Sequence, residues 1–162
     1  MRRSWKLLLF AATAAVVMSL GSNAIVGWYN NTQADRGVSY VVWMATIEYA
    51  NLHHGRLPDA NHWEDSLRSV WSHGPHRFAF TAELTPGFSY IPRRLAMNSS
   101  LSGMGMRAIG IRQMARTVLY YEVDSRGSNA TGNPPRDILD PPFGRLTPMT
   151  ICLDGQISNP VP

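Results

Sequence analysis

The sequence predicts an α+β fold, in which a long N-terminal helical region packs on a small antiparallel sheet with long loops. In the first third of the chain, apolar residues form an uncharged run and then recur at three- and four-residue spacing, which is typical of helices. After residue 76, short runs of β-branched and aromatic residues alternate with glycine and proline, which is typical of strands and turns. A chain of 162 residues has room for one compact domain of ordinary size.

The charge distribution indicates membrane topology rather than nucleic-acid binding. The formal net charge is +4, and three of the positive charges, Arg2, Arg3 and Lys6, precede the first apolar run. The remaining chain is almost neutral, so we expect no nucleic-acid partner. Cys152 is the only cysteine, which excludes an internal disulfide and a metal site built from several cysteines.

The uncharged segment from Leu7 to Trp28 has two interpretations. As a transmembrane helix it has about the 20 residues needed to cross the hydrocarbon, with Trp5 and Trp28 at the two interfaces. As a secretory signal, its most apolar part would be the hydrophobic region, and the small residues ending at Ala24 would be the cleavage site. The span length and the flanking tryptophans favour a retained anchor.

Both interpretations give the same organisation of the chain. Residues 1–28 form a transmembrane anchor or signal sequence, and residues 29–162 form an exported domain, because the positive N-terminal end stays in the cytoplasm. We expect a break in the helical region near Gly27 to Gly37.

An amphipathic helix follows, ending in the sequence YANLHHGRLP. Its apolar face is formed by Val38, Val41, Val42, Ala45, Tyr49 and Leu52. We expect the helix to stop around His53 to Arg56, since Gly55 favours helix termination and Pro58 cannot continue the hydrogen-bond ladder.

The histidines near this helix end raise the question of a metal site. Adjacent His53 and His54 point about 100° apart on a helix, so they cannot chelate one ion from the same face. His62, His73 and His76 follow in the sequence without a metal-ligand spacing. We expect a solvated helix end and a polar loop, and zinc binding remains the alternative.

A second, short helix is predicted in the sequence NHWEDSLRSVW. Asn61 can cap it, and its apolar side is formed by Trp63, Leu67, Val70 and Trp71. Glu64 and Asp65 near its start suit the helix dipole. We interpret them as an exposed pair and not as an acid/base dyad, which needs two convergent carboxyl groups in different environments.

Four segments are predicted to form strands: RFAFT, GFSYI, RTVLYYEV and MTICLD. In the clearest, Thr117 to Val123, we expect the more apolar alternate side chains (Thr117, Leu119, Tyr121 and Val123) to pack against the helix. Glu122 would then face water or pair with Arg94 or Arg116.

Several ordered motifs resemble one known family. The sequence has Y-A-x-x-x-x-G-x-x-P from Tyr49 to Pro58, then LAMNSSLSG from Leu95 to Gly103, then ARTVLYYEVD from Ala115 to Asp124, and finally LDG ending at Gly155. In this order they resemble the bacterial prepilin-type proteins with a processing-associated H-x9-DG segment, which are related to the type II secretion pseudopilins. The resemblance spans Val38 to Ile157.

The chain also departs from this family. It has no Gly-Phe peptidase junction and no acidic residue before Asp35. Gly144 stands at the histidine position of H-x9-DG, and Gln156 replaces the histidine that often follows. Asp154 and Gly155 are most simply a tight turn after the strand MTICLD, because glycine tolerates positive φ and aspartate bonds its neighbouring backbone.

The resemblance implies a pilin-like fold and a non-enzymatic, membrane-anchored pseudopilin-like protein. It would be a minor or accessory subunit of a type II secretion or pilus-like system, with the membrane and other pilin-like or secretion-system subunits as partners. It would cross the cell membrane once, with the N-terminus in the cytoplasm. No residue is predicted to be catalytic or cofactor-binding.

An exported ligand- or metal-binding domain on the same scaffold is the alternative function. Related pseudopilins bind calcium through a loop near the sheet. The corresponding candidates here are the oxygen-rich sequence DSRGSNATGN, which starts at Asp124, and the sequence RDILD, residues 136–140.

Overall fold

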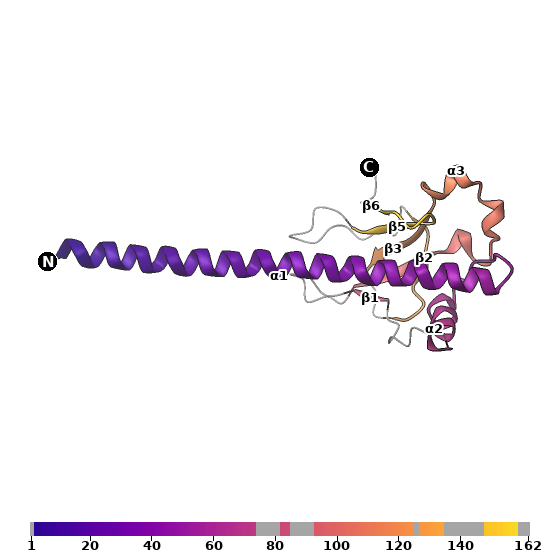
Figure 1. Cartoon of the computed structure of the whole chain (residues 1–162), viewed down its shortest axis with the longest axis horizontal. Coiled ribbons are helices and arrows are strands. Elements are labelled where there is room, and N and C mark those ends of the chain that lie inside the picture. The colour runs from indigo at the N-terminus through magenta and orange to yellow at the C-terminus, as the bar shows by residue number, and fades with distance from the viewer. Residues whose placement is uncertain (1, 74–81, 85–92, 125–126, 135–147, 159–162) are drawn as a thin grey trace.

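The structure, a computed structural model, describes residues 2–73, 82–84, 93–124, 127–134 and 148–158. Its elements in chain order are α1 (Arg2–Leu52), α2 (Trp63–His73), β1 (Glu83–Leu84), β2 (Arg93–Asn98), the 3-10 helices η1 (Ser99–Leu101) and η2 (Met106–Ala108), α3 (Ile111–Met114), β3 (Val118–Val123), β4 (Thr131–Gly132), β5 (Thr150–Cys152) and β6 (Ile157–Ser158). Helices and a sheet are both present, as expected. Figure 1 shows α1 extending far beyond the head, in which all other elements lie.

The sheet has the strand order β1-β2-β3-β5-β6, and β4 also pairs with β2. These neighbours are antiparallel except for β4, which is parallel to β2, so the expectation of a purely antiparallel sheet is wrong at this edge. Two of the four predicted strands are confirmed, as β3 and β5. The other two, at residues 77–81 and 87–91, lie outside the described residues.

Helix α1 is continuous over 51 residues, so the expected break near Gly27 to Gly37 is wrong. A single glycine costs a helix about 1 kcal/mol relative to alanine, which the neighbouring residues can absorb, and α1 contains no proline. Every side chain described between Met18 and Ala34 is exposed, and Asp35 is the first one that is buried. Within the described residues, no helix combines the length and the apolar composition of a membrane span.

The end of α1 lies where the sequence predicts it. Gly55 N–H donates to the Ala50 carbonyl (2.7 Å), which closes the last turn, and Gly55 has a positive φ of +79°. The residue before it, His54, also adopts the left-handed region, with φ +57°. Histidine is one of the few side chains that enter this region with some frequency, so two residues together reverse the chain.

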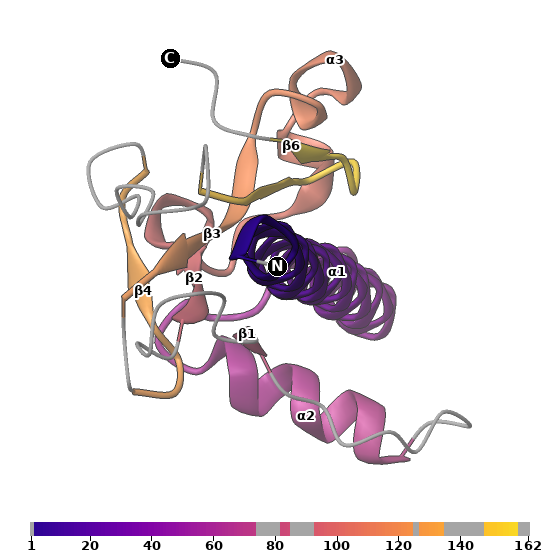
Figure 2. The same cartoon turned by 90° about the vertical axis from the view of Figure 1, so that its left-hand side faces the viewer.

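The core lies between the last turns of α1, α2 and one face of the sheet. Figure 2 looks along α1 from its N-terminus and shows the sheet curving around it, with α2 on one side and α3 on the other. The largest fully buried side chains of the core are Leu57, Trp63, Leu67, Leu95, Met97, Leu119, Tyr120, Ile151 and Leu153.

Strand β3 meets α1 with the face opposite to the one predicted. The Tyr120 hydroxyl lies 2.8 Å from Thr46 Oγ1 of α1, and Tyr120 is paired with Met97 of β2, which is also in the core. Both faces of β3 are covered, since Tyr121 is buried as well. Apolar character therefore cannot distinguish the faces. The pairing with β5 shifts between Val118 and Tyr120, and Leu119 joins the core at this irregularity.

The turn between β5 and β6 is the tight turn predicted from Asp154 and Gly155. Asp154 Oδ1 accepts a hydrogen bond from Gln156 N–H (3.0 Å), and Gly155 has a φ of +86°. The turn also lies against α1, because the Trp43 indole N–H donates to the Leu153 carbonyl (3.1 Å). A Cβ added at Gly155 would lie 2.7 Å from Trp43 Cε2. Glycine is thus required here both by its φ and by the indole ring.

Comparing two glycine substitutions separates these two requirements. Gly55 has a similar positive φ but no atom within 4 Å of an added Cβ. We expect Gly55→Ala to lower the free energy of unfolding by about 1–2 kcal/mol, and Gly155→Ala by about 1–3 kcal/mol more, because only the second crowds a packed side chain. Denaturant melts check this. Equal losses, or an excess that persists in a Trp43→Ala background, would contradict the steric role of the indole.

Burial also makes stability depend on pH through Tyr120. Desolvation raises the pKa of its phenol above the ordinary value of 10.0, and the hydrogen bond with Thr46 offsets only part of this. The unfolded chain loses the phenol proton above about pH 10 while the folded chain keeps it, so the free energy of unfolding falls as pH rises beyond that point. Tyr120→Phe should reduce this fall, measured by denaturant melts between about pH 9 and 11. Tyr40→Phe, at an exposed position, should leave it unchanged.

Candidate functional site

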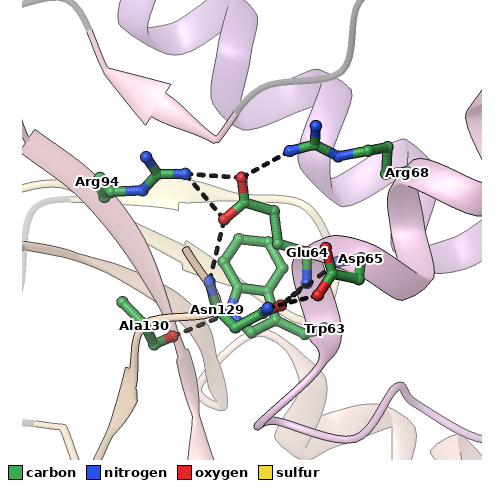
Figure 3. A network of polar contacts seen from close by, with 7 residues as sticks. All are labelled: Trp63, Glu64, Asp65, Arg68, Arg94, Asn129 and Ala130. Carbon is green, nitrogen blue, oxygen red and sulfur yellow. Dashed lines mark hydrogen bonds and ion pairs between the residues drawn. The ribbon is translucent and has the colours of Figure 1, made fainter. Parts of the chain in front are cut away.

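The most densely connected polar group in the described structure surrounds Glu64, at the start of α2. Glu64 is only 1% exposed. Its carboxylate accepts hydrogen bonds from Arg94 Nη2 (2.7 and 2.9 Å to its two oxygens), Arg68 Nη2 (3.3 Å) and Asn129 N–H (3.1 Å). We call Glu64, Arg68, Arg94 and Asn129 the Glu64 clamp (Figure 3). It connects α2, β2 and the segment before β4, which are far apart in the sequence.

Asn129, which is distant from α2 in the sequence, caps the first turn of this helix. Its Oδ1 accepts from the N–H groups of Glu64 (2.8 Å) and Asp65 (3.3 Å), and its Nδ2 donates to Asp65 Oδ2 (2.7 Å). Asn129 has a φ of +54°, a conformation that asparagine tolerates well. The sequence suggested Asn61 as the cap, but these donors bind Asn129 instead.

The geometry of the clamp indicates a structural role. Both Glu64 oxygens already accept hydrogen bonds from cationic or backbone donors. A general base needs a lone pair directed at a substrate, and a metal ligand needs one directed at an ion. Glu64 and Asp65 were expected to form an exposed pair. Instead, Glu64 is buried, Asp65 is exposed and Asn129 bridges them.

Trp63 fixes the same corner of the head through its indole. Its ring lies 4.7 Å from the ring of Tyr120, and its Nε1–H donates to the Ala130 carbonyl (2.9 Å). Ala130 in turn accepts from Met97 N–H of β2 (2.9 Å). The clamp and the indole therefore hold residues 129–131 along the edge of the sheet, where β4 pairs with β2.

Glu122 is another buried carboxylate, and its position contradicts the expectation that it faces water or pairs with Arg94 or Arg116. It is fully buried, and its Oε2 accepts from Met149 N–H (3.1 Å). Arg94 binds Glu64 instead, and Arg116 is exposed. Alternation along β3 places Glu122 on the same face as Tyr120. Because this face packs against α1 instead of the predicted one, Glu122 is buried as well.

The predicted metal-binding positions are not gathered into one site. The His53 ring stacks on Tyr49 with ring centres 4.0 Å apart, and His53, His54 and His62 are all exposed. The side chain of His73 and the whole of His76 lie outside the described part. Among the residues that the structure describes, no three metal-ligating side chains come together.

The calcium candidates are only partly described. Asp124 is exposed, and Asn129, in the middle of the same oxygen-rich sequence, has its Oδ1 engaged at the start of α2. Residues 125–126 and 136–140 lie outside the described residues. Calcium and zinc binding therefore stay predictions.

The first two motifs behind the family resemblance meet in the structure. Met106 N–H donates to the Gly55 carbonyl (2.8 Å), Leu57 N–H to the Met104 carbonyl (2.9 Å), and Gly103 N–H to the Pro58 carbonyl (3.1 Å). These bonds join the segment after α1 to the segment after β2. The motif glycines and proline thus shape a backbone contact and carry no reactive group.

Asn98, in the second motif, ties β2 to β3. Its Nδ2 donates to the Val118 carbonyl (2.8 Å), and its Oδ1 accepts from Ser100 N–H (3.1 Å) and Ser100 Oγ (2.7 Å). It caps η1 and at the same time connects the end of one strand to the start of the next. The motif asparagine is therefore explained by the fold.

The Glu64 clamp gives a sharp test with a matched neighbour. Glu64→Gln removes a buried charge from two arginines, so we expect the free energy of unfolding to fall by about 3–5 kcal/mol. Asp65→Asn, one residue further, changes an exposed carboxylate and should cost about 0–1 kcal/mol. Denaturant melts measure both values. Equal losses would mean that the clamp contributes no more than a surface ion pair.

Comparison of the chain with family models, with curated proteins and with solved structures found no match in any of the three. The family resemblance therefore depends on the motif residues themselves.

Proposed function

We propose that the protein is a non-enzymatic, membrane-anchored, pseudopilin-like protein, a minor or accessory subunit of a bacterial type II secretion or pilus-like system. The observation that carries this proposal is the shape of α1. The helix is 51 residues long, and among its described side chains Asp35 is the first that is buried. The preceding residues extend about 50 Å at 1.5 Å per residue, which exceeds the hydrocarbon thickness of a bilayer.

The sequence of this projecting part suits an anchor with its N-terminus in the cytoplasm. Arg2, Arg3 and Lys6 precede the uncharged segment, and no further charge occurs before Asp35. The head then lies outside the cytoplasm, connected through the same helix. On this proposal the protein crosses the cell membrane once.

The head supports the proposal through the roles of its motif residues. The Tyr49–Pro58 and Leu95–Gly103 motifs form one backbone contact, and Asp154 and Gly155 form a turn against Trp43. These residues stabilise a helix on a sheet, as expected if the motifs mark a shared scaffold and not a catalytic site. The missing Gly-Phe junction and the missing acidic residue before Asp35 favour a minor or accessory role over that of a major filament subunit.

Localisation of the full-length protein tests the proposal. In bacterial cells we expect it in the membrane fraction after alkaline carbonate extraction, and alkaline phosphatase fused after Pro162 should be active, because that enzyme folds only outside the cytoplasm. Recovery of full-length protein in the soluble cytosolic fraction, or an inactive phosphatase with a fluorescent cytoplasmic fusion, would refute it. Determining the mature N-terminus distinguishes the anchor from the signal sequence, since cleavage after Ala24 would leave no anchor.

Two alanine substitutions provide a matched control. Ala15→Arg places a charge within the apolar run, where it costs insertion about 2.5–3.5 kcal/mol, so membrane recovery should fall. Ala34→Arg makes the same change at an exposed position next to the head and should leave recovery unchanged. The same loss from both variants would argue against insertion of the apolar run.

A further inference from the structure

Four exposed arginines lie in two neighbouring segments of the head, the one that follows α1 and the one between β2 and β3. We call them the basic pole: Arg56, Arg107, Arg112 and Arg116. Arg56 follows the end of α1, and the other three lie in or beside η2 and α3, which Figure 1 shows at the opposite end of the molecule from the N-terminus. The sequence has no acidic residue between Glu83 and Glu122 to balance them.

Backbone contacts hold these segments side by side. Arg56 and Gly105 form an antiparallel bridge, and Met106 N–H donates to the Gly55 carbonyl (2.8 Å). Arg107 directly follows Met106, so it lies near Arg56 although the two are far apart in the sequence. The fold thus brings Arg56 and Arg107 together, and Arg112 and Arg116 follow in α3 and just after it.

The guanidinium groups of the basic pole have no ion-pair partner among the described residues. Within the described residues, the ion pairs between side chains join Glu64 to Arg68 and Arg94, and none involves the basic pole. The nearest acidic residue along the chain from Arg56 is Asp59, whose Oδ1 already accepts from Asn61 N–H (2.8 Å) and Ser102 Oγ (3.3 Å). Four guanidinium groups therefore remain available for an external partner.

An apolar side chain lies among these charges. Ile111 in α3 is 85% exposed, the most exposed of the described large apolar side chains. Its backbone is fixed, because Gln113 N–H donates to the Gly110 carbonyl (2.7 Å) and Arg116 N–H to the Gln113 carbonyl (2.9 Å). Met114, on the same turn, packs against the core. An exposed apolar side chain beside arginines is a combination that protein interfaces favour.

We propose that the basic pole is a docking surface for an acidic segment of a partner protein, in which an apolar side chain flanked by carboxylates packs on Ile111. Arginine binds carboxylates in a planar, two-bond geometry, which makes it suited to this role. A single-stranded nucleic acid fits less well, because residues 99–116 contain no aromatic side chain on which bases could stack. The proposal goes beyond the proposed function, since it depends only on the folded head.

The binding test uses the full-length protein in a nonionic detergent and a fluorescein-labelled peptide in which glutamates flank a central leucine. Fluorescence anisotropy should show saturable binding that weakens as salt is added. The triple variant Arg107→Gln, Arg112→Gln and Arg116→Gln should bind about tenfold more weakly. Arg36→Gln, which removes an exposed charge from α1, should bind like the unaltered protein.

Ile111→Ser tests the apolar part of the surface. It should weaken binding of the leucine peptide but not of a peptide in which glutamine replaces the leucine. Because Ile111 is so exposed, thermal melts should show no loss of stability for this variant. The proposal is overturned if the leucine peptide does not bind, if the triple variant binds it as well as the unaltered protein, or if duplex DNA or anionic vesicles bind through these arginines while the peptide does not.

Discussion

The packing of α1 on the sheet depends on a hydrogen bond between two hydroxyl groups that are both buried. Thr46 Oγ1 donates its proton to the Val42 carbonyl (2.8 Å), so the Tyr120 hydroxyl must donate to Thr46. Leaving the Tyr120 hydroxyl unpaired would cost about 1–3 kcal/mol, which makes this contact directional as well as apolar. It fixes the rotation of α1 about its own axis. With that rotation set, Trp43 reaches the Leu153 carbonyl and Ser39 Oγ reaches Met149 Sδ (3.3 Å).

The sequence predicts the features that have local causes. The end of α1 is set by Gly55 and its neighbours, the extended conformation of Val118–Val123 by β-branched and aromatic residues, and the turn at Asp154 and Gly155 by the φ of glycine. The resulting α+β arrangement was predictable for the same reason. The continuity of α1 was not, because an isolated glycine weakens a helix without breaking it when the surrounding residues favour helix.

Other features are decided by partners that are distant in the sequence. The cap of α2 comes from Asn129, 65 residues after Glu64, and no local signal points to it. The burial of Glu64 and Glu122 depends on Arg94 and on the backbone of Met149, which only the folded sheet brings near. The face of β3 was misjudged because both faces are covered, and alternation identifies the inner face only when the outer one is solvated. The sequence therefore predicted neither the grouping of Glu64, Arg68, Arg94 and Asn129 nor the pairs that they form.

The unbroken course of α1 makes the helix a lever. Its projecting part and the part that carries Trp43 and Thr46 belong to one continuous helix, without a proline to act as a hinge. Over about 50 Å, a tilt of about 6° at the N-terminal end displaces the head by about 5 Å. Any force on the projecting part is therefore transmitted as torque to the contacts of Thr46 with Tyr120 and of Trp43 with the β5–β6 turn. The stiffness of this junction determines how closely the orientation of the head follows that of the helix.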